Sequence, residues 1–161
     1  IEKTANFLEA KNISRIITSP LLRTKQSAQI ISEFLNLPEA SESPNLLEIR
    51  SSFEGLPMEA IAKTKFDYYF SKNRKENDET MEEIFKRMKQ FVDHALNQDV
   101  SENIVAVSHG DPIMILMAGL AKLPFILDSI RTKAYIQYGE VVKISRENSN
   151  YIVKRLFNPN L

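Results

Sequence analysis

Apolar residues recur along this chain at two spacings, which separate helical segments from strands. Spacings of three and four residues predict amphipathic helices, and short β-branched runs predict strands. The predicted helices span residues 1–11, 22–35, 58–63, 78–96 and 112–121. The predicted strands span residues 15–18, 104–107, 135–137, 141–145 and 151–156.

The longest helix carries the clearest apolar stripe, formed by Met81, Ile84, Phe85, Met88, Phe91, Val92 and Leu96. The second helix is expected to face inward through Ala28, Ile31, Phe34 and Leu35. Because helices and strands alternate, the pattern predicts an α/β protein. The expected architecture is a three-layer α/β/α sandwich with a largely parallel central sheet and a meandering β edge.

Composition narrows the possible classes of function. The 161 residues fit one domain spanning residues 1–161. The 21 basic and 21 acidic residues balance, so charge gives no support for nucleic-acid or anionic-membrane partners. Cysteine is absent, which excludes disulfides and thiolate chemistry and fits a cytoplasmic location. No apolar run approaches a membrane span of roughly 20 residues, and oligomeric state has no signature in the sequence.

Two strand ends carry the candidate chemistry. The strand 104–107 stops abruptly and is followed by His109 and Gly110, just before a helix. The strand 15–18 is followed by Ser19 and by a helix with Arg23 in its first turn. The carboxyl ends of strands that face helix amino termini are where α/β proteins bind anions. Because a guanidinium offers a planar fork for phosphate oxygens, these residues predict a phosphate pocket.

The same segments resemble motifs of the histidine phosphatase (phosphoglycerate mutase-like) superfamily. Residues 19–28, Ser-Pro-Leu-Leu-Arg-Thr-Lys-Gln-Ser-Ala, resemble its Ser-Pro-Leu-x-Arg segment. Residues 47–48, Leu-Glu, followed by Phe-Glu-Gly at 53–55, resemble its acid-bearing loop. Residues 107–110, Val-Ser-His-Gly, resemble its second histidine motif. A weaker likeness joins residues 77–80 and Arg87 to a further Gly-Glu-Ser and helical arginine pattern.

One family motif has no counterpart. The family's nucleophile is the histidine of an Arg-His-Gly segment that ends its first strand, and no Arg-His-Gly occurs here. The other histidine, His94, lies on the long helix and is expected to be an ordinary surface residue. The chain starts at Ile1, inside a helical pattern without a capping residue. We therefore expect an N-terminally truncated domain, a first strand and nucleophilic histidine upstream of residue 1, and an inactive 161-residue form.

The resemblance implies a phosphomonoesterase that acts on a small phosphorylated metabolite through a phosphohistidine intermediate, without a metal or cofactor. Arg23 would bind the phosphate with help from Ser19 and the Gly110 backbone amide. His109 would donate to an equatorial oxygen and, when protonated, offset charge in the transition state. Glu48 would protonate the leaving oxygen and then activate water.

Several alternatives stay open at this point. The spacing of the acid loop departs from the family pattern, so Glu54 is the alternative acid. Asp111 is expected to cap the helix that begins near Pro112, because a carboxylate beside a phosphate would otherwise need a hydroxyl or cation partner. The activity could instead be a mutase-like phosphoryl shift, or the chain could be a non-catalytic phosphate-binding module. Specificity is expected to come from residues 49–80 and 122–134. Their cations Lys63, Lys65, Arg74 and Arg131 are candidates to contact a polyanion, although each is expected to be a solvated surface charge.

Overall fold

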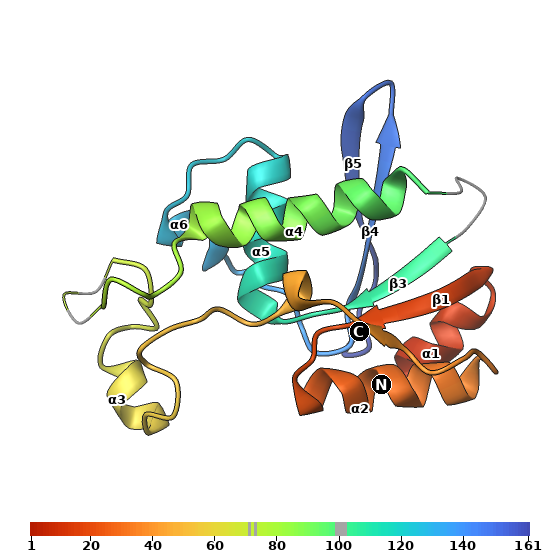
Figure 1. Ribbon diagram of the computed structural model, residues 1–161, viewed down its shortest axis with the longest axis horizontal. Coiled ribbons are helices and arrows are strands. Elements are labelled where there is room, and N and C mark those ends of the chain that lie inside the picture. Colours follow the sequence, from red (N-terminus) through yellow and green to blue (C-terminus); the bar gives the residue numbers. More distant parts are fainter. Residues whose placement is uncertain (71, 73, 99–102) are drawn as a thin grey trace.

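The computed structural model describes residues 1–70, 72, 74–98 and 103–161. Its helices are α1 (Glu2–Glu9), α2 (Leu22–Phe34), a 3₁₀ turn η1 (Pro44–Leu46), α3 (Met58–Ala62), α4 (Met81–Leu96), α5 (Gly110–Leu120) and α6 (Leu127–Ile130). Its strands are β1 (Ile13–Thr18), β2 (Ser41–Glu42), β3 (Asn103–Val107), β4 (Val141–Glu147) and β5 (Asn150–Phe157). Figure 1 shows the arrangement of these elements.

A parallel three-stranded sheet forms the centre of the molecule, in the order β2-β1-β3. Both neighbours of β1 run parallel to it. At their carboxyl ends Thr18 of β1 is in register with Val107 of β3. The loops that follow these two strands therefore leave the sheet side by side (Figure 1).

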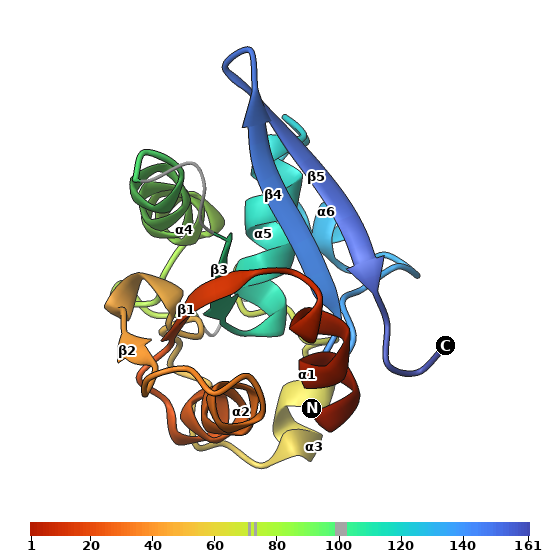
Figure 2. The same cartoon turned by 90° about the vertical axis from the view of Figure 1, so that its right-hand side faces the viewer.

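Helices cover both faces of this sheet (Figure 2). Successive residues of a strand point to opposite faces. Ile16 accordingly belongs to the cluster formed with α1 and α2 through residues such as Ala5 and Ala28. Its neighbour Ile17 packs against the larger cluster that contains the stripe of α4 and the core of α5. The predicted three-layer α/β architecture with a parallel central sheet is confirmed.

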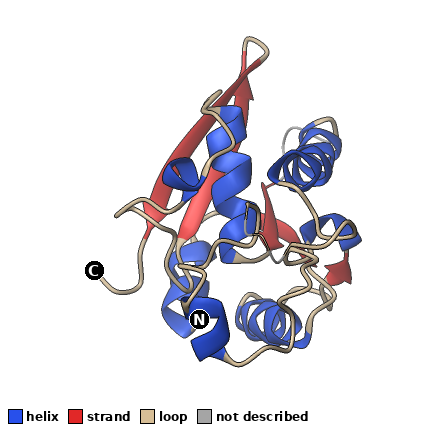
Figure 3. Ribbon diagram, turned by 90° about the vertical axis from the view of Figure 1, so that its left-hand side faces the viewer, coloured by secondary structure: helices blue, strands red, loops and turns tan. Residues whose placement is uncertain are grey.

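The last two strands form a separate antiparallel hairpin, β4-β5 (Figure 3). Within the described ranges β3 is hydrogen-bonded to a strand on one side only, and β4 pairs only with β5. Val141 at the start of β4 still packs against the same buried cluster as Val105 and Val107 of β3. The hairpin is thus joined to the sheet by side-chain packing rather than by a backbone ladder.

Some local predictions were wrong. Residues 135–137 form a loop rather than a strand, because Ile136 is buried as a single core residue within a run of turns. Phe34 is 43% exposed instead of facing the core. Helix α4 begins at Met81, where Thr80 and Glu83 form a capping box. The short elements β2, η1 and α6 were not predicted. No helix in the part of the chain that the structure describes is long and apolar enough to cross a membrane.

Candidate active site

The ends of β1 and β3 bring Ser19 and His109 together. The Ser19 amide donates to the Val107 carbonyl oxygen at 2.9 Å, which continues the strand pairing by one residue. One ring nitrogen of His109, Nε2, lies 2.8 Å from the Ser19 hydroxyl oxygen. Both side chains are buried. Two residues that are 90 positions apart therefore form one hydrogen-bonded pair below the surface.

Arg23 and Glu48 complete a cluster around this pair. The Arg23 Nη2 atom lies 3.4 Å from Glu48 Oε2, and His109 Nδ1 lies 3.6 Å from the same oxygen. The Arg23 side chain is 60% exposed, since it projects from the first turn of α2 into open space. The cluster therefore joins residues from the β1–α2 connection, the 43–57 loop and the β3–α5 connection. Arg23 is the member with a guanidinium free to turn toward a ligand.

Burial raises the pKa of the Glu48 carboxyl above its ordinary value, and the nearby Asp111 carboxylate raises this pKa further. The Ile49 amide, which donates to Glu48 Oε1 at 3.2 Å, and the Arg23 guanidinium oppose this increase. The net direction is upward. A raised pKa is what a carboxyl needs to act as a general acid near neutral pH.

His109 has the opposite character. Burial lowers the pKa of its imidazole to about 4, with help from the positive charges of Arg23 and Arg87. The ring is therefore neutral at pH 7. Burial thus works against the protonated form that, when present, would offset charge in the transition state. A neutral ring still offers one N–H donor and one acceptor.

This pKa predicts how stability depends on pH. In the unfolded chain His109 has its ordinary pKa of 6.5. Between pH 6.5 and about 4 its imidazole is therefore protonated in the unfolded chain but neutral in the folded protein. The free energy of unfolding should fall as pH decreases through that window, with a total loss of about 3 kcal/mol from this residue. Urea denaturation at several pH values measures the loss. In the His109→Asn variant this component should vanish, and an identical pH profile for both proteins would contradict the assignment.

Arg87 holds the loop that carries Glu48. Its Nη1 atom donates to the carbonyl oxygens of Asn45 and Leu47, both at 2.8 Å, and its Nη2 atom donates to that of Glu48 at 3.3 Å. Its Nε atom lies 2.8 Å from Glu79 Oε1, and this pair is largely buried. One guanidinium of α4 thus holds three carbonyl oxygens of this loop, those of Asn45, Leu47 and Glu48. Its weak likeness to a family pattern was the only signal of this role in the sequence.

Replacing Arg87 with Met should destabilise the protein. The change leaves the Glu79 carboxylate buried without its partner and three carbonyl oxygens without a donor. Breaking a buried pair in this way costs about 3 kcal/mol of the free energy of unfolding. The matched control is Lys89→Met on the same helix, because the side chains of the Lys89–Asp93 pair are about one third exposed and the pair should contribute less than about 1 kcal/mol. Equal losses in the two variants by denaturant titration would refute the proposed clamp.

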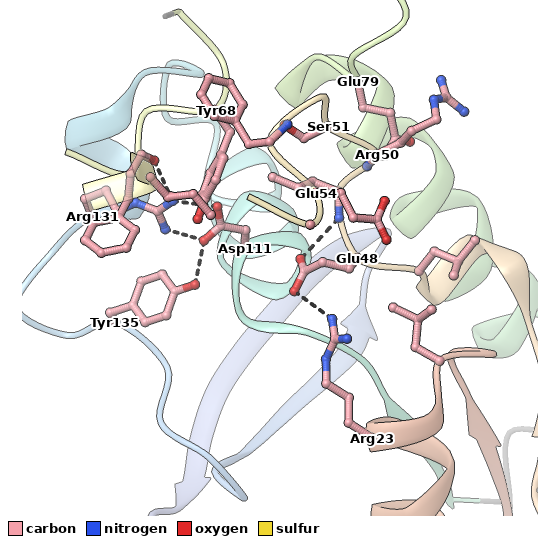
Figure 4. Close-up of a pocket in the computed structure, with 17 residues that line it drawn as sticks. Arg23, Glu48, Arg50, Ser51, Glu54, Tyr68, Glu79, Asp111, Arg131 and Tyr135 are labelled. Carbon is pink, nitrogen blue, oxygen red and sulfur yellow. Dashed lines mark hydrogen bonds and ion pairs between the residues drawn. The ribbon is translucent and has the colours of Figure 1, made fainter. Parts of the chain in front are cut away.

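Beside the cluster lies a cavity of about 810 Å³. Arg23, Glu48 and Glu54 all line it (Figure 4). Of the two candidate acids, Glu48 is the one next to Arg23 and His109. Ser19, His109 and Gly110 lie behind the lining rather than in it. Ser19 is therefore placed to orient His109 rather than to touch a ligand in this arrangement.

Gly110 has a different constraint from the one expected. A Cβ at this position would overlap the hydroxyl group of Tyr135. The glycine thus lets the Tyr135 side chain approach the amino terminus of α5. Whether its amide also contacts phosphate stays a prediction.

Asp111 does not cap a helix. Helix α5 begins at Gly110, with His109 at the N-cap position, so Asp111 lies inside the first turn. Its carboxylate is buried and binds Arg131, and it accepts hydrogen bonds from Tyr69 at 2.9 Å and Tyr135 at 2.5 Å. The sequence analysis expected that a carboxylate here, if it did not cap the helix, would need a hydroxyl or cation partner. Two tyrosine hydroxyls and the Arg131 guanidinium are those partners (Figure 4). Their positions in separate loops gave no pattern that sequence analysis could detect.

The remaining histidine lies elsewhere. His94 is exposed on α4 and interacts with Gln98, as expected for a surface residue. Among the residues that the structure describes, no group of three His, Asp or Glu side chains is arranged to hold a metal ion.

Comparison with known proteins identifies the family. The model of the histidine phosphatase superfamily (branch 1) matches residues 1–159. The chain belongs to the histidine phosphatase superfamily. The resemblance found in the sequence motifs is thereby confirmed over nearly the whole chain.

Two curated proteins resemble this chain. An uncharacterized phosphatase, PhoE, of Bacillus subtilis is 27% identical over 119 residues. A probable phosphoglycerate mutase, GpmB, of Yersinia enterocolitica is 28% identical over 127 residues. Each match covers 74% of this chain and 59% of the relative. The matched region therefore spans less than two thirds of these relatives.

Solved structures share the fold of this chain. YhfR of Bacillus stearothermophilus superposes with a TM-score of 0.80 at 21% identity, covering 96% of this chain and 78% of that protein. A mycobacterial glucosyl-3-phosphoglycerate phosphatase superposes with a TM-score of 0.77 at 18% identity, covering 96% and 82%. At these identities the likeness establishes the fold alone.

Proposed function

We propose that the full-length protein that contains this chain is a phosphomonoesterase acting on a small phosphorylated metabolite. The observation that carries the proposal is the convergence of three residues from separate segments: Arg23 and Glu48 line one cavity, and His109 lies behind them, next to Glu48. Arg23 would bind two phosphate oxygens through its planar fork. The amino terminus of α2 would add its dipole to that binding.

The proposed reaction proceeds in two steps through a phosphohistidine. In the first, an imidazole nitrogen attacks phosphorus, the bond to the ester oxygen breaks, and Glu48 gives that oxygen its proton. In the second, Glu48 removes a proton from water, whose oxygen attacks phosphorus and releases inorganic phosphate and the free imidazole. His109 would donate a hydrogen bond to an equatorial oxygen during both steps.

The nucleophile in this proposal is a histidine outside residues 1–161. His94 is exposed on α4 and away from the cavity lining. His109 is buried, and its Nε2 atom interacts with Ser19. The assignment of an upstream histidine therefore rests on two points. The family's motif places the nucleophile there, and both histidines of this chain already interact with other side chains.

The test uses the full-length protein with a panel of small phosphomonoesters. We expect release of inorganic phosphate and, after quenching with an alkaline denaturant, a phosphorylated protein that is stable to base and labile to acid. The 161-residue chain should show no turnover. A phosphoryl shift without phosphate release would instead support the mutase alternative, and phosphate binding without any turnover would support a non-catalytic module. The cytoplasmic location and the lack of nucleic-acid and membrane partners stay predictions from composition.

A further inference from the structure

Three cationic side chains line the cavity, and they differ in their freedom to bind an anion: Arg23, Arg50 and Arg131. Arg23 is exposed at the phosphate end. The Arg50 guanidinium donates through Nε to the Asn77 carbonyl oxygen and turns away from the other labelled side chains (Figure 4). Arg131 lies across the cavity from Arg23, beside Tyr68 and Tyr135 (Figure 4). Whether Arg131 can accept a second anionic group decides what kind of substrate the cavity suits.

The fork of Arg131 is already occupied. Both of its terminal nitrogens bind the Asp111 carboxylate, with Nη2 at 2.7 Å from Oδ2. The same Nη2 atom also donates to the Phe66 carbonyl oxygen at 3.1 Å. Its Nε atom is buried and has no hydrogen-bond partner among the described residues. The Tyr68 and Tyr135 rings lie 5.8 and 5.4 Å from the guanidinium carbon. This guanidinium therefore presents no paired N–H groups to a ligand.

Asp111 is equally committed. Each of its two oxygens accepts two hydrogen bonds, from Arg131 and Tyr69 at Oδ2 and from Arg131 and Tyr135 at Oδ1. Four bonds fill the acceptor capacity of a carboxylate. Asp111 thus has no lone pair left for a substrate hydroxyl or amine. The Asp111 carboxylate therefore neutralises the positive charge of Arg131 at the cavity wall.

Apolar and acidic side chains make up most of the remaining lining. The carboxylates of Glu48 and Glu54 face the same space as Asp111 (Figure 4). Six apolar side chains form much of the wall: Leu21, Leu47, Ile49, Phe53, Ile61 and Phe66. A second anionic group beside Arg131 would lose its water, find that guanidinium already bound to Asp111 and lie near carboxylates, which is costly in a partly desolvated site.

We infer that Asp111, by closing the fork of Arg131, makes the cavity select phosphomonoesters with an uncharged, largely apolar body and reject those with a second anionic group. The inference rests on the proposed phosphomonoesterase activity and narrows its substrate class. It also disfavours a phosphorylated carboxylic acid as the substrate. Asp111 is a specificity-determining residue that acts through Arg131.

The experiment compares two matched substrates, 4-carbamoylphenyl phosphate and 4-carboxyphenyl phosphate, in the full-length protein. They have nearly the same shape, and one carries an extra negative charge. We expect the kcat/KM for the carbamoyl compound to exceed that for the carboxy compound by about tenfold or more. In Asp111→Asn, which frees Arg131 while keeping a similar shape, this ratio should fall by about tenfold. Intrinsic reactivity cancels when the ratio is compared between proteins.

Asp128→Asn is the matched control, since it also removes one carboxylate near Arg131 in sequence but outside the cavity lining. Its ratio should equal that of the unmodified protein. A ratio near one in the unmodified protein, or an unchanged ratio in folded Asp111→Asn, overturns the inference. If Asp111→Asn does not fold, the salt dependence of the unmodified protein tests the inference instead. The kcat/KM ratio of the carbamoyl to the carboxy compound should decrease as the salt concentration rises, because salt screens the charge that causes it. A ratio that does not depend on salt overturns the inference. Absence of turnover with both substrates would instead count against the proposed function.

Discussion

Replacing Arg23 with Gln is expected to lower kcat/KM for a phosphomonoester by about a thousandfold. The residue lies in the first turn of α2 and is the exposed cation nearest Glu48 and His109. Gln keeps a polar side chain but removes the charge and the planar fork. A thousandfold loss equals about 4 kcal/mol of transition-state stabilisation, which is in the range of strong charged donors.

Arg50→Gln provides the matched control for Arg23. Arg50 also lines the cavity, but its guanidinium binds the Asn77 carbonyl oxygen instead of facing the phosphate end. Its loss should change kcat/KM by less than about threefold, below 1 kcal/mol. Steady-state kinetics and inhibition by inorganic phosphate measure both effects. If Arg23→Gln retains kcat/KM within threefold while remaining folded, the assignment of Arg23 to phosphate binding is wrong.

Replacing Glu48 with Gln should give a loss that depends on the leaving group. An alkyl alcohol needs a proton as it leaves, so turnover of an alkyl phosphate should fall by about a thousandfold. Nitrophenolate leaves without a proton, so the first turnover of 4-nitrophenyl phosphate should stay fast. The second step still needs a base, so phosphoenzyme should accumulate and give a burst of nitrophenol followed by slow turnover.

The same measurement separates the two candidate acids. Glu54→Gln is the control, because Glu54 lines the cavity but is not the carboxylate beside Arg23 and His109. It should show neither the leaving-group dependence nor the burst. If the pattern appears in Glu54→Gln and not in Glu48→Gln, the acid assignment moves to Glu54.

The pH profile gives an independent check on Glu48. Burial is the largest cause of its raised pKa, and Asp111 adds to it. As a general acid Glu48 must be protonated when the ester bond breaks. With an alkyl phosphate, kcat should therefore fall as pH rises through that pKa, and Glu48→Gln should remove this limb.

The sequence predicted the elements well wherever local pattern and tertiary structure agree. The stripe of α4 from Met81 to Val92 is buried as its spacing requires. The motif segments also fixed where Arg23 and His109 lie, because a strand end followed by a helix is a local feature. Phe34 and residues 135–137 show the limit, since a single apolar residue can face solvent or fill a core gap without changing the pattern.

By itself the sequence determined the family, the α/β class and the candidates Arg23, Glu48 and His109, because each of these is written in short contiguous segments. Only the tertiary structure decided that Arg87 fixes the Glu48 loop, that the His109 imidazole is neutral, and that Asp111 closes Arg131. The physical reason is the same in each case. Burial and pairing between groups tens of residues apart set the charge and the available hydrogen bonds, and no local pattern encodes either of them.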